Sequence, residues 1–239
     1  MGARAKWRMV DWFRAMADSY SAVLFDMDGL LLDTERIYVH AQRQAASEFG
    51  FEASDDLLHS FVGVSGKECI RMMVEAAGDG FPVEEYQLRW YQTWRQLVAD
   101  DGVPVRNGIG SLLAWLVDEG VARGVVTSTH RKDAELCLRA AGVYDVFDYV
   151  TTGDEVTHNK PAPDIYLLGA ERMGVAPAEC IALEDSDAGV LSAAAAGLRT
   201  IMVPDLRQPS PEARAAAYTV VSTLGEAESL VKAWLVVDK

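Results

Sequence analysis

Two carboxylates separated by a single residue, Asp26 and Asp28, are the first residues of the chain whose types and spacing indicate chemistry. Asp26 can attack a phosphorus atom and form an aspartyl-phosphate. Asp28 can protonate the leaving oxygen and then activate the water that cleaves this intermediate. An isolated pair of this kind is common in ordinary turns, so the interpretation depends on partners elsewhere in the chain.

The partners are a hydroxyl, an amine and a second acid pair. Thr127 and Lys160 can donate hydrogen bonds to a transferred phosphoryl group. Carboxylates brought into one pocket repel one another, so a cation is expected among them. Oxygen ligands without His or Cys favour Mg²⁺, and the strongest candidates are Asp26 and Asp185, helped by a backbone carbonyl of the first turn. The predicted metal-binding set is Asp26, Asp28, Glu184 and Asp185.

Short apolar runs that predict buried strands end at three of these polar sites. The runs cover residues 22–25, 123–126 and 180–183, and a fourth covers 200–203. Stretches with helical patterns separate them, at 110–119, 132–141, 164–173 and 188–196. This alternation predicts right-handed βαβ units, and hence an α/β fold with a parallel sheet covered by helices on both faces. Ligands of such sheets bind beyond the carboxyl ends of the strands, where the candidate residues are expected to meet.

The alternation fails between residues 35 and 104, where helices are predicted at 35–49, 67–77 and 83–99. We therefore expect a small helical cap at 35–104, inserted after the first strand of a core formed by 21–34 and 105–239. The aromatic side chains Trp90, Tyr91 and Trp94 are expected in the core of this cap. Residues 1–20 are assigned as an N-terminal extension, which is either a short docking helix or an artefact of the start position. Residues 204–211 are predicted to form a polar loop, and 224–234 a closing helix.

Composition limits the class of protein. The 239 residues are 50% hydrophobic and contain 36 acidic and 22 basic side chains, for a net charge of −14. This balance predicts a soluble globular protein that binds neither nucleic acid nor a membrane. Three widely separated cysteines suit a reducing compartment, so a cytoplasmic protein is predicted. We also expect the protein to be a monomer.

Four ordered motifs resemble those of the haloacid dehalogenase superfamily, in its phosphatase and β-phosphoglucomutase-like branch. They are FDMDGLLLDTE at 25–35, VTS at 126–128, KPAPD at 160–164 and LEDS at 183–186. The resemblance covers almost the whole chain from residue 22 to 234. It implies a Rossmann-like core with a helical cap inserted after the first strand.

The same resemblance implies a role for each motif residue. Asp26 would be the nucleophile and Asp28 the acid/base, while Thr127 and Lys160 would hold the phosphoryl group. Asp185 would bind Mg²⁺ directly, with Glu184 assisting through the lysine or a metal-bound water. The predicted substrate-binding residues are Ser128 in the core and Gly63, Ser65 and Lys67 in the cap.

Within the superfamily, the resemblance favours a hydrolase. Asp28 favours phosphoryl transfer over cleavage of a carbon–halogen bond, because a leaving halide needs no proton. Phosphomutases of this branch carry a cap histidine at the position of Tyr38, and His40 is expected on nearly the opposite side of its helix. We predict a Mg²⁺-dependent phosphatase of a small phosphorylated metabolite, such as a sugar phosphate. The alternatives are a β-phosphoglucomutase-like phosphomutase and a non-catalytic metabolite-binding protein, with dehalogenase activity more distant.

Overall fold

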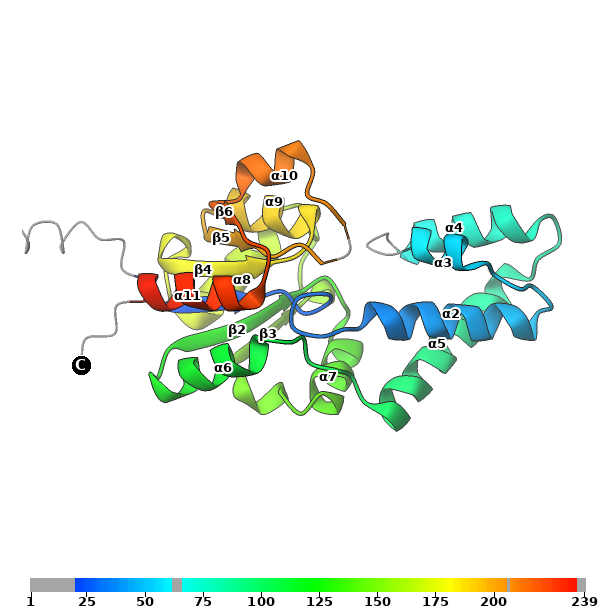
Figure 1. Cartoon of the computed structure of the whole chain (residues 1–239), viewed down its shortest axis with the longest axis horizontal. Helices are drawn as coiled ribbons and strands as arrows, with labels where there is room; N and C mark the ends of the chain where they lie inside the picture. Colours follow the sequence, from blue (N-terminus) through cyan, green and yellow to red (C-terminus); the bar gives the residue numbers. More distant parts are fainter. Residues whose placement is uncertain (1–19, 62–65, 206, 236–239) are drawn as a thin grey trace, which may run out of the picture.

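A parallel β-sheet forms the centre of the molecule (Figure 1). The structure is a computed structural model that describes residues 20–61, 66–205 and 207–235. Within these ranges six strands pair in the order β3-β2-β1-β4-β5-β6. They are β1 (Ala22–Phe25), β2 (Ala122–Thr127), β3 (Tyr149–Thr152), β4 (Cys180–Glu184), β5 (Arg199–Met202) and β6 (Thr219–Val220). The predicted fold class, a parallel sheet covered on both faces, is confirmed.

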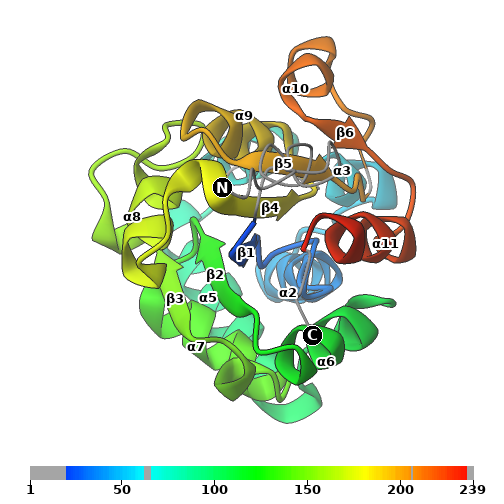
Figure 2. The ribbon, with the colours of Figure 1, turned by 90° about the vertical axis from the view of Figure 1, so that its left-hand side faces the viewer.

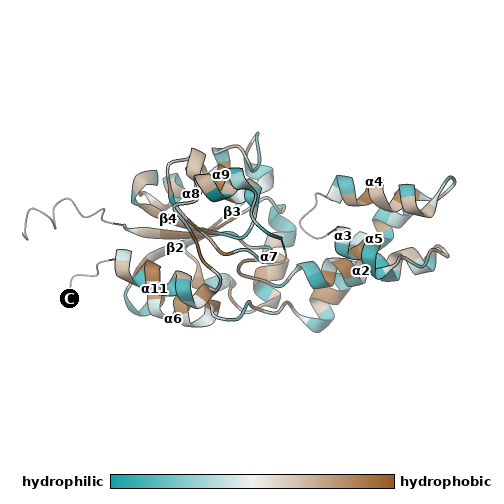
Figure 3. Ribbon diagram, turned by 45° about the horizontal axis from the view of Figure 1, so that its top comes forward, coloured by the Kyte–Doolittle hydropathy of each residue, from teal (hydrophilic) through white to brown (hydrophobic). Residues whose placement is uncertain are grey.

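Helices cover both faces of the sheet because successive side chains of each strand point in opposite directions. In β1, Val23 and Phe25 belong to the buried cluster formed with α6, α7 and α11, whereas Ala22 and Leu24 belong to the cluster formed with α8 and α9. Figure 2 shows these two groups of helices on either side of the sheet, and Figure 3 shows hydrophobic residues concentrated along the strands. The core helices are α6 (Ile109–Asp118), α7 (Arg131–Ala140), α8 (Asp164–Met173), α9 (Asp187–Ala195), α10 (Pro211–Ala216) and α11 (Leu224–Trp234). Short 3₁₀ turns lie at Tyr144–Val146, Gly153–Glu155 and Pro177–Glu179.

In the described part of the chain, four further helices follow β1 and lie beyond the carboxyl edge of the sheet (Figure 1). They are α2 (Glu35–Glu48), α3 (Asp55–Ser60), α4 (Gly66–Ala77) and α5 (Val83–Asp101). These helices have a buried cluster of their own, which includes Ala45, Leu58, Met73 and Tyr86. Of the three aromatic residues expected in the cap core, Trp94 is 2% exposed but belongs to the buried cluster of the sheet and its helices, whereas Trp90 and Tyr91 are only partly buried.

The chain enters and leaves this helical part through two adjacent segments. Leu32 forms an antiparallel bridge with Val105. The amide of Asp33 donates to the carbonyl of Pro104 over 2.9 Å, and the amide of Arg106 donates to the carbonyl of Leu31 over 2.8 Å. We propose the boundaries 34/35 and 104/105, as predicted from the sequence, as the limits between core and cap.

The predicted N-terminal extension at 1–20 lies outside the described residues, except for Tyr20. The Tyr20 ring lies 6.1 Å from that of Trp234, between ring centroids. No helix in the described ranges is both long enough and apolar enough to cross a membrane.

An ion-pair network fixes the turn that follows β3, and Glu155 is at its centre. Arg172 donates to both carboxylate oxygens, over 2.7 and 2.9 Å, and Arg131 donates over 2.5 Å. The backbone amide of Thr152 donates over 2.9 Å. Hydrogen bonds from Arg172 lower the pKa of Glu155 from 4.5 to about 2, although burial opposes this change.

We expect Glu155→Gln to lower the free energy of unfolding at pH 7 by about 1–3 kcal/mol, because it removes the charge that pairs with two arginines. A carboxylate whose pKa is lowered on folding stabilises the protein above its unfolded pKa. The difference between wild type and variant should therefore shrink as the pH falls from 4.5 towards 2. Urea unfolding at a series of pH values measures this, with the exposed Glu212→Gln as control. A difference that is independent of pH would contradict the prediction.

Candidate active site

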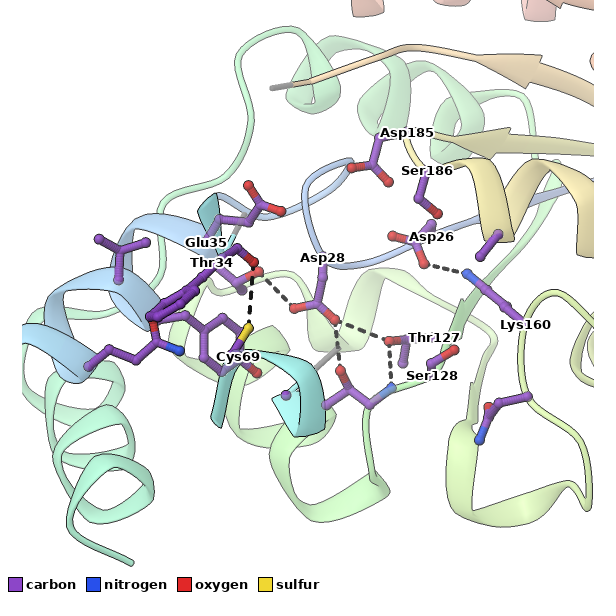
Figure 4. Close-up of a pocket in the computed structure, with 18 of the residues that line it drawn as sticks. Asp26, Asp28, Thr34, Glu35, Cys69, Thr127, Ser128, Lys160, Asp185 and Ser186 are labelled. Atoms are coloured by element: carbon purple, nitrogen blue, oxygen red, sulfur yellow. Dashed lines mark hydrogen bonds and ion pairs between the residues drawn. The ribbon is translucent and has the colours of Figure 1, made fainter. Parts of the chain in front are cut away.

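Three neighbouring strands bring the predicted site residues together (Figure 4). Asp26 directly follows β1, Thr127 is the last residue of β2, and Glu184 is the last residue of β4. Strands β2 and β4 flank β1, and their register sets Phe25 beside both Val125 and Leu183. The polar residues that follow these positions therefore emerge at the same edge of the sheet.

Lys160 reaches this edge from the loop before α8. Its Nζ donates to Asp26 Oδ1 over 2.5 Å, to Glu184 Oε1 over 2.6 Å and to the carbonyl of Val126 over 3.0 Å. All three side chains are almost fully buried, with at most 9% of each exposed. Burial alone would lower the pKa of Lys160, but the two carboxylates outweigh it and raise that pKa above its ordinary value.

Glu184 is held from two further sides. The hydroxyl of Tyr166 donates to Glu184 Oε1 over 2.6 Å, and Ser186 Oγ donates to Oε2 over 3.3 Å. Burial raises the pKa of the Tyr166 phenol, and the charge of Glu184 raises it further, so the phenol keeps its proton. These contacts orient Glu184 towards Lys160, in agreement with a role that acts through the lysine.

Three acids at this edge have the spacing of a cation site. One carboxylate oxygen from each of Asp26, Glu184 and Asp185 lies within 4.8 Å of the other two. Oδ1 of Asp185 is buried and has no hydrogen-bond partner within the described part of the chain. Burial raises the pKa of Asp185 well above its ordinary value, and the charges of the other two acids raise it further. Burial likewise raises the pKa of Asp26 to about 8, although Lys160 lowers it. A divalent cation would compensate this concentration of negative charge.

Gly29 allows Asp185 to approach the turn after β1. Its φ is +85°, a conformation that favours glycine, and a Cβ atom at this position would lie 2.2 Å from Asp185 Oδ2. A side chain at residue 29 would therefore have to displace the carboxylate that is proposed to bind the metal.

We expect Gly29→Ala to weaken Mg²⁺ binding by about tenfold or more, because the new methyl group displaces Asp185. Gly50→Ala is a matched control, since Gly50 has a φ of +76° but no atom within 4 Å of the corresponding Cβ position. Both variants place alanine at a positive φ and so share the same backbone strain. Only Gly29→Ala should lose affinity for Mg²⁺ in calorimetric titration. Equal affinities in the two variants would contradict this account.

Asp28 faces three hydroxyl groups. Thr34 Oγ1 donates to its Oδ1 over 2.7 Å, and Thr129 Oγ1 and Thr127 Oγ1 donate to its Oδ2 over 2.8 and 3.2 Å. Its carboxylate lies outside the group of three acids that approach one another, so a part for Asp28 in metal binding remains a prediction. Thr34 and Thr129 were not predicted as site residues. Thr34 lies within the first predicted motif, at 25–35, and Thr129 directly follows the second, at 126–128; these positions are the only sequence signal for them.

A cavity of about 620 Å³ opens over these residues. Asp26, Asp28, Lys160 and Asp185 line it, together with the predicted substrate-binding residue Ser128. Lys67 is exposed on α4 and is not among the lining residues. The predicted cap residues Gly63 and Ser65 lie outside the described residues.

The other wall of the cavity comes from the cap helices and is largely apolar. It includes Tyr38, Gln42, Phe61, Cys69 and Trp90, and Figure 4 shows Cys69 and Lys160 on opposite sides of Asp28. None of these five residues was predicted as a site residue, because their meeting depends on how the cap helices pack against one another.

The fold and this site define an α/β enzyme with an acidic centre at the carboxyl edge of its sheet. Residues 23–203 match the family described as haloacid dehalogenase-like hydrolase, and the chain belongs to this family. The family predicted from the four motifs is thereby confirmed, as is the hydrolase class.

Individual relatives cover most of the chain. A phosphorylated carbohydrates phosphatase of Thermotoga maritima is 31% identical over 212 residues, which are 89% of this chain and 90% of that protein. A fructose-1-phosphate phosphatase of Escherichia coli is 30% identical over 188 residues, 79% of this chain and 98% of that protein. A crystal structure from Thermotoga maritima, provisionally described as a β-phosphoglucomutase, is 29% identical with a TM-score of 0.79, and the match covers 89% of this chain and 99% of that one.

Proposed function

We propose that this protein is a Mg²⁺-dependent phosphatase that hydrolyses a sugar phosphate or a similar small phosphate monoester through an aspartyl-phosphate. The main support for this proposal is that Lys160 contacts both Asp26 and Glu184. These contacts lie beside the buried oxygen of Asp185 that has no partner among the described residues. The ammonium group of Lys160, held next to the buried carboxylate of Asp26, can bind the charged phosphoryl group that this carboxylate accepts. The phosphatases among the relatives support this choice of reaction.

In the first half-reaction, an oxygen of Asp26 attacks phosphorus as the bond to the leaving oxygen breaks. Asp28 donates a proton to that oxygen, and the alcohol leaves. In the second half-reaction, Asp28 takes a proton from water, which attacks the same phosphorus and releases phosphate and the carboxylate of Asp26. Lys160 and the hydroxyl of Thr127 stabilise the phosphoryl oxygens in both steps.

The acid cluster fits Mg²⁺, which prefers oxygen ligands. Asp26 and Asp185 would hold the ion directly. Glu184 is already bonded to Lys160 and Tyr166, so it would act through the lysine or through a metal-bound water. Mg²⁺ supplies positive charge that offsets the phosphoryl and carboxylate charges.

A phosphomutase is the second candidate, supported by the likeness to the provisionally described β-phosphoglucomutase. Against it, Tyr38 occupies the position of the mutase histidine and lines the cavity. Burial raises the pKa of the Tyr38 phenol, and the charge of Asp28 raises it further, so the phenol keeps its proton near neutral pH and is a poor general base. His40 is exposed on the same helix and does not line the cavity.

Hydrolysis of p-nitrophenyl phosphate tests the proposal, and a panel of phosphorylated sugars then narrows the substrate. We expect release of phosphate that stops when EDTA removes the metal and resumes with Mg²⁺. Interconversion of sugar phosphate isomers, dependent on a sugar bisphosphate and with little free phosphate, would identify a phosphomutase. Binding of phosphorylated sugars without turnover of any panel member would identify a non-catalytic binding protein.

We further propose that the enzyme acts as a monomer on free metabolites in the cytoplasm. The three cysteines Cys69, Cys137 and Cys180 are buried and form no disulfide in the described part of the chain, and this and the strongly negative net charge support the proposal. Analytical ultracentrifugation would test the oligomeric state.

A further inference from the structure

Gln42 is a buried polar residue on the cap wall of the cavity. It lies on the inward side of α2, one turn after Tyr38, and only 3% of its surface is exposed. Most of its buried neighbours on that helix are alanines: Ala41, Ala45 and Ala46. The packing of α2 therefore requires no amide at this position, and burying one is unfavourable unless it is hydrogen-bonded.

The amide of Gln42 is only half satisfied. Burial raises the pKa of the Cys69 thiol, and a hydrogen bond with the Gln42 side chain counteracts part of that rise. Oε1 is buried and has no hydrogen-bond partner among the described residues. An unpartnered acceptor on the wall of a cavity can bind a ligand that carries a hydrogen-bond donor.

A second unpartnered group lines the same wall. Nε1 of Trp90 is buried and also has no partner within the described ranges. The Trp90 ring lies in contact distance of Tyr38 and Tyr86, with centroids 6.4 Å apart in each case. The cap wall thus offers an unused acceptor and an unused donor in aromatic surroundings.

We propose that Gln42 is a specificity-determining residue that accepts a hydrogen bond from a hydroxyl of the sugar in the leaving group. A hydroxyl is both a donor and an acceptor, so a single sugar can satisfy Gln42 Oε1 and Trp90 Nε1 together. The apolar C–H face of a sugar ring also packs well against the aromatic side chains of this wall. The inference rests on the proposed phosphatase function and names the part of the site that selects the substrate.

Gln42→Met tests this, because methionine keeps the length of the side chain and removes both polar atoms. The kcat/KM of the variant is measured with fructose 1-phosphate, glucose 6-phosphate and ribose 5-phosphate, and with p-nitrophenyl phosphate, whose leaving group has no hydroxyl besides the one formed in the reaction. We expect wild type to prefer at least one sugar phosphate over p-nitrophenyl phosphate. For that sugar the variant should lose about tenfold or more in kcat/KM, while p-nitrophenyl phosphate changes less than about threefold. Gln44→Met, on the exposed side of the same helix, is the matched control and should change neither value.

The remaining outcomes separate the inference from the proposed function. Equal losses for all substrates would mean that Gln42 only supports the fold, and no loss for any would mean that it contacts no leaving group; either overturns the inference. Hydrolysis of p-nitrophenyl phosphate without preference for any of the three sugars also overturns it, while the phosphatase assignment stands. No hydrolysis of any ester by wild type refutes the proposed function and this inference with it. If Gln42→Met does not fold, Trp90→Phe takes its place and must show the same selective loss.

Discussion

Asp26→Asn should reduce kcat for phosphate ester hydrolysis by a factor of about a thousand or more, because an amide oxygen is a poor nucleophile towards phosphorus. The fold should persist, since asparagine has the same shape and its oxygen can still accept a hydrogen bond from Lys160 Nζ. Steady-state kinetics with p-nitrophenyl phosphate at saturating Mg²⁺ measure the loss, and circular dichroism checks the fold.

Asp118→Asn is the matched control for this substitution. Asp118 lies at the exposed end of α6, far along the sheet from the cavity, so the same chemical change should leave kcat unaltered. Rapid-quench experiments with the wild type should trap phosphate bound to the protein, and Asp26→Asn should abolish this species. Retention of wild-type turnover by Asp26→Asn would refute the assignment of Asp26 as the nucleophile.

Lys160→Met should affect both stability and activity. Removing the amine leaves the buried carboxylates of Asp26 and Glu184 without their cation, which typically lowers the free energy of unfolding by about 3–5 kcal/mol. Activity should fall by about a hundredfold or more, because the phosphoryl group loses a fixed positive charge. Mg²⁺ should restore part of the stability, since it offsets the same carboxylates, but should not restore the rate.

Urea unfolding with and without Mg²⁺ measures the effect on stability. Lys232→Met is the control, because Lys232 forms an ion pair with Glu228 over 2.6 Å but remains 38% exposed. An exposed pair of this kind contributes less than about 1 kcal/mol. Similar losses of stability in the two lysine variants would show that the buried contacts of Lys160 stabilise the fold no more than an exposed ion pair does.

The central strands were predictable from the sequence because each is an apolar run that ends abruptly in a polar turn. The predicted runs at 22–25, 123–126 and 180–183 coincide closely with β1, β2 and β4. The edge strand β3 was not predicted, since its residues Tyr149–Thr152 include two threonines and a tyrosine that is 48% exposed. Strand β6 has only two residues, and helix α3 has six, so neither produces a periodic pattern.

The acidic residues of the site, Asp26, Asp28, Glu184 and Asp185, were also predictable, because parallel strands bring their carboxyl ends to one edge of the sheet. The sequence does not reveal the contacts that depend on side chains from distant elements. Asp28 was predicted as the acid/base and Thr127 as a phosphoryl-binding residue, but the other two threonine partners of Asp28, Thr34 and Thr129, were not assigned to the site. Gln42 gave no signal, since a polar residue on an amphipathic helix is ordinarily assigned to the solvent side, and only the packing of the cap shows it buried.

The paired segments at Leu31–Asp33 and Pro104–Arg106 also bear on how this protein can be altered. Because the two ends of the helical insertion already meet, a short turn can replace everything between them without stretching the sheet. Exchanging that module for one of another length or shape would then change which alcohols are admitted, while the groups that handle phosphorus keep their positions. Selectivity and reactivity can accordingly diverge separately in descendants or designed chimaeras of this chain.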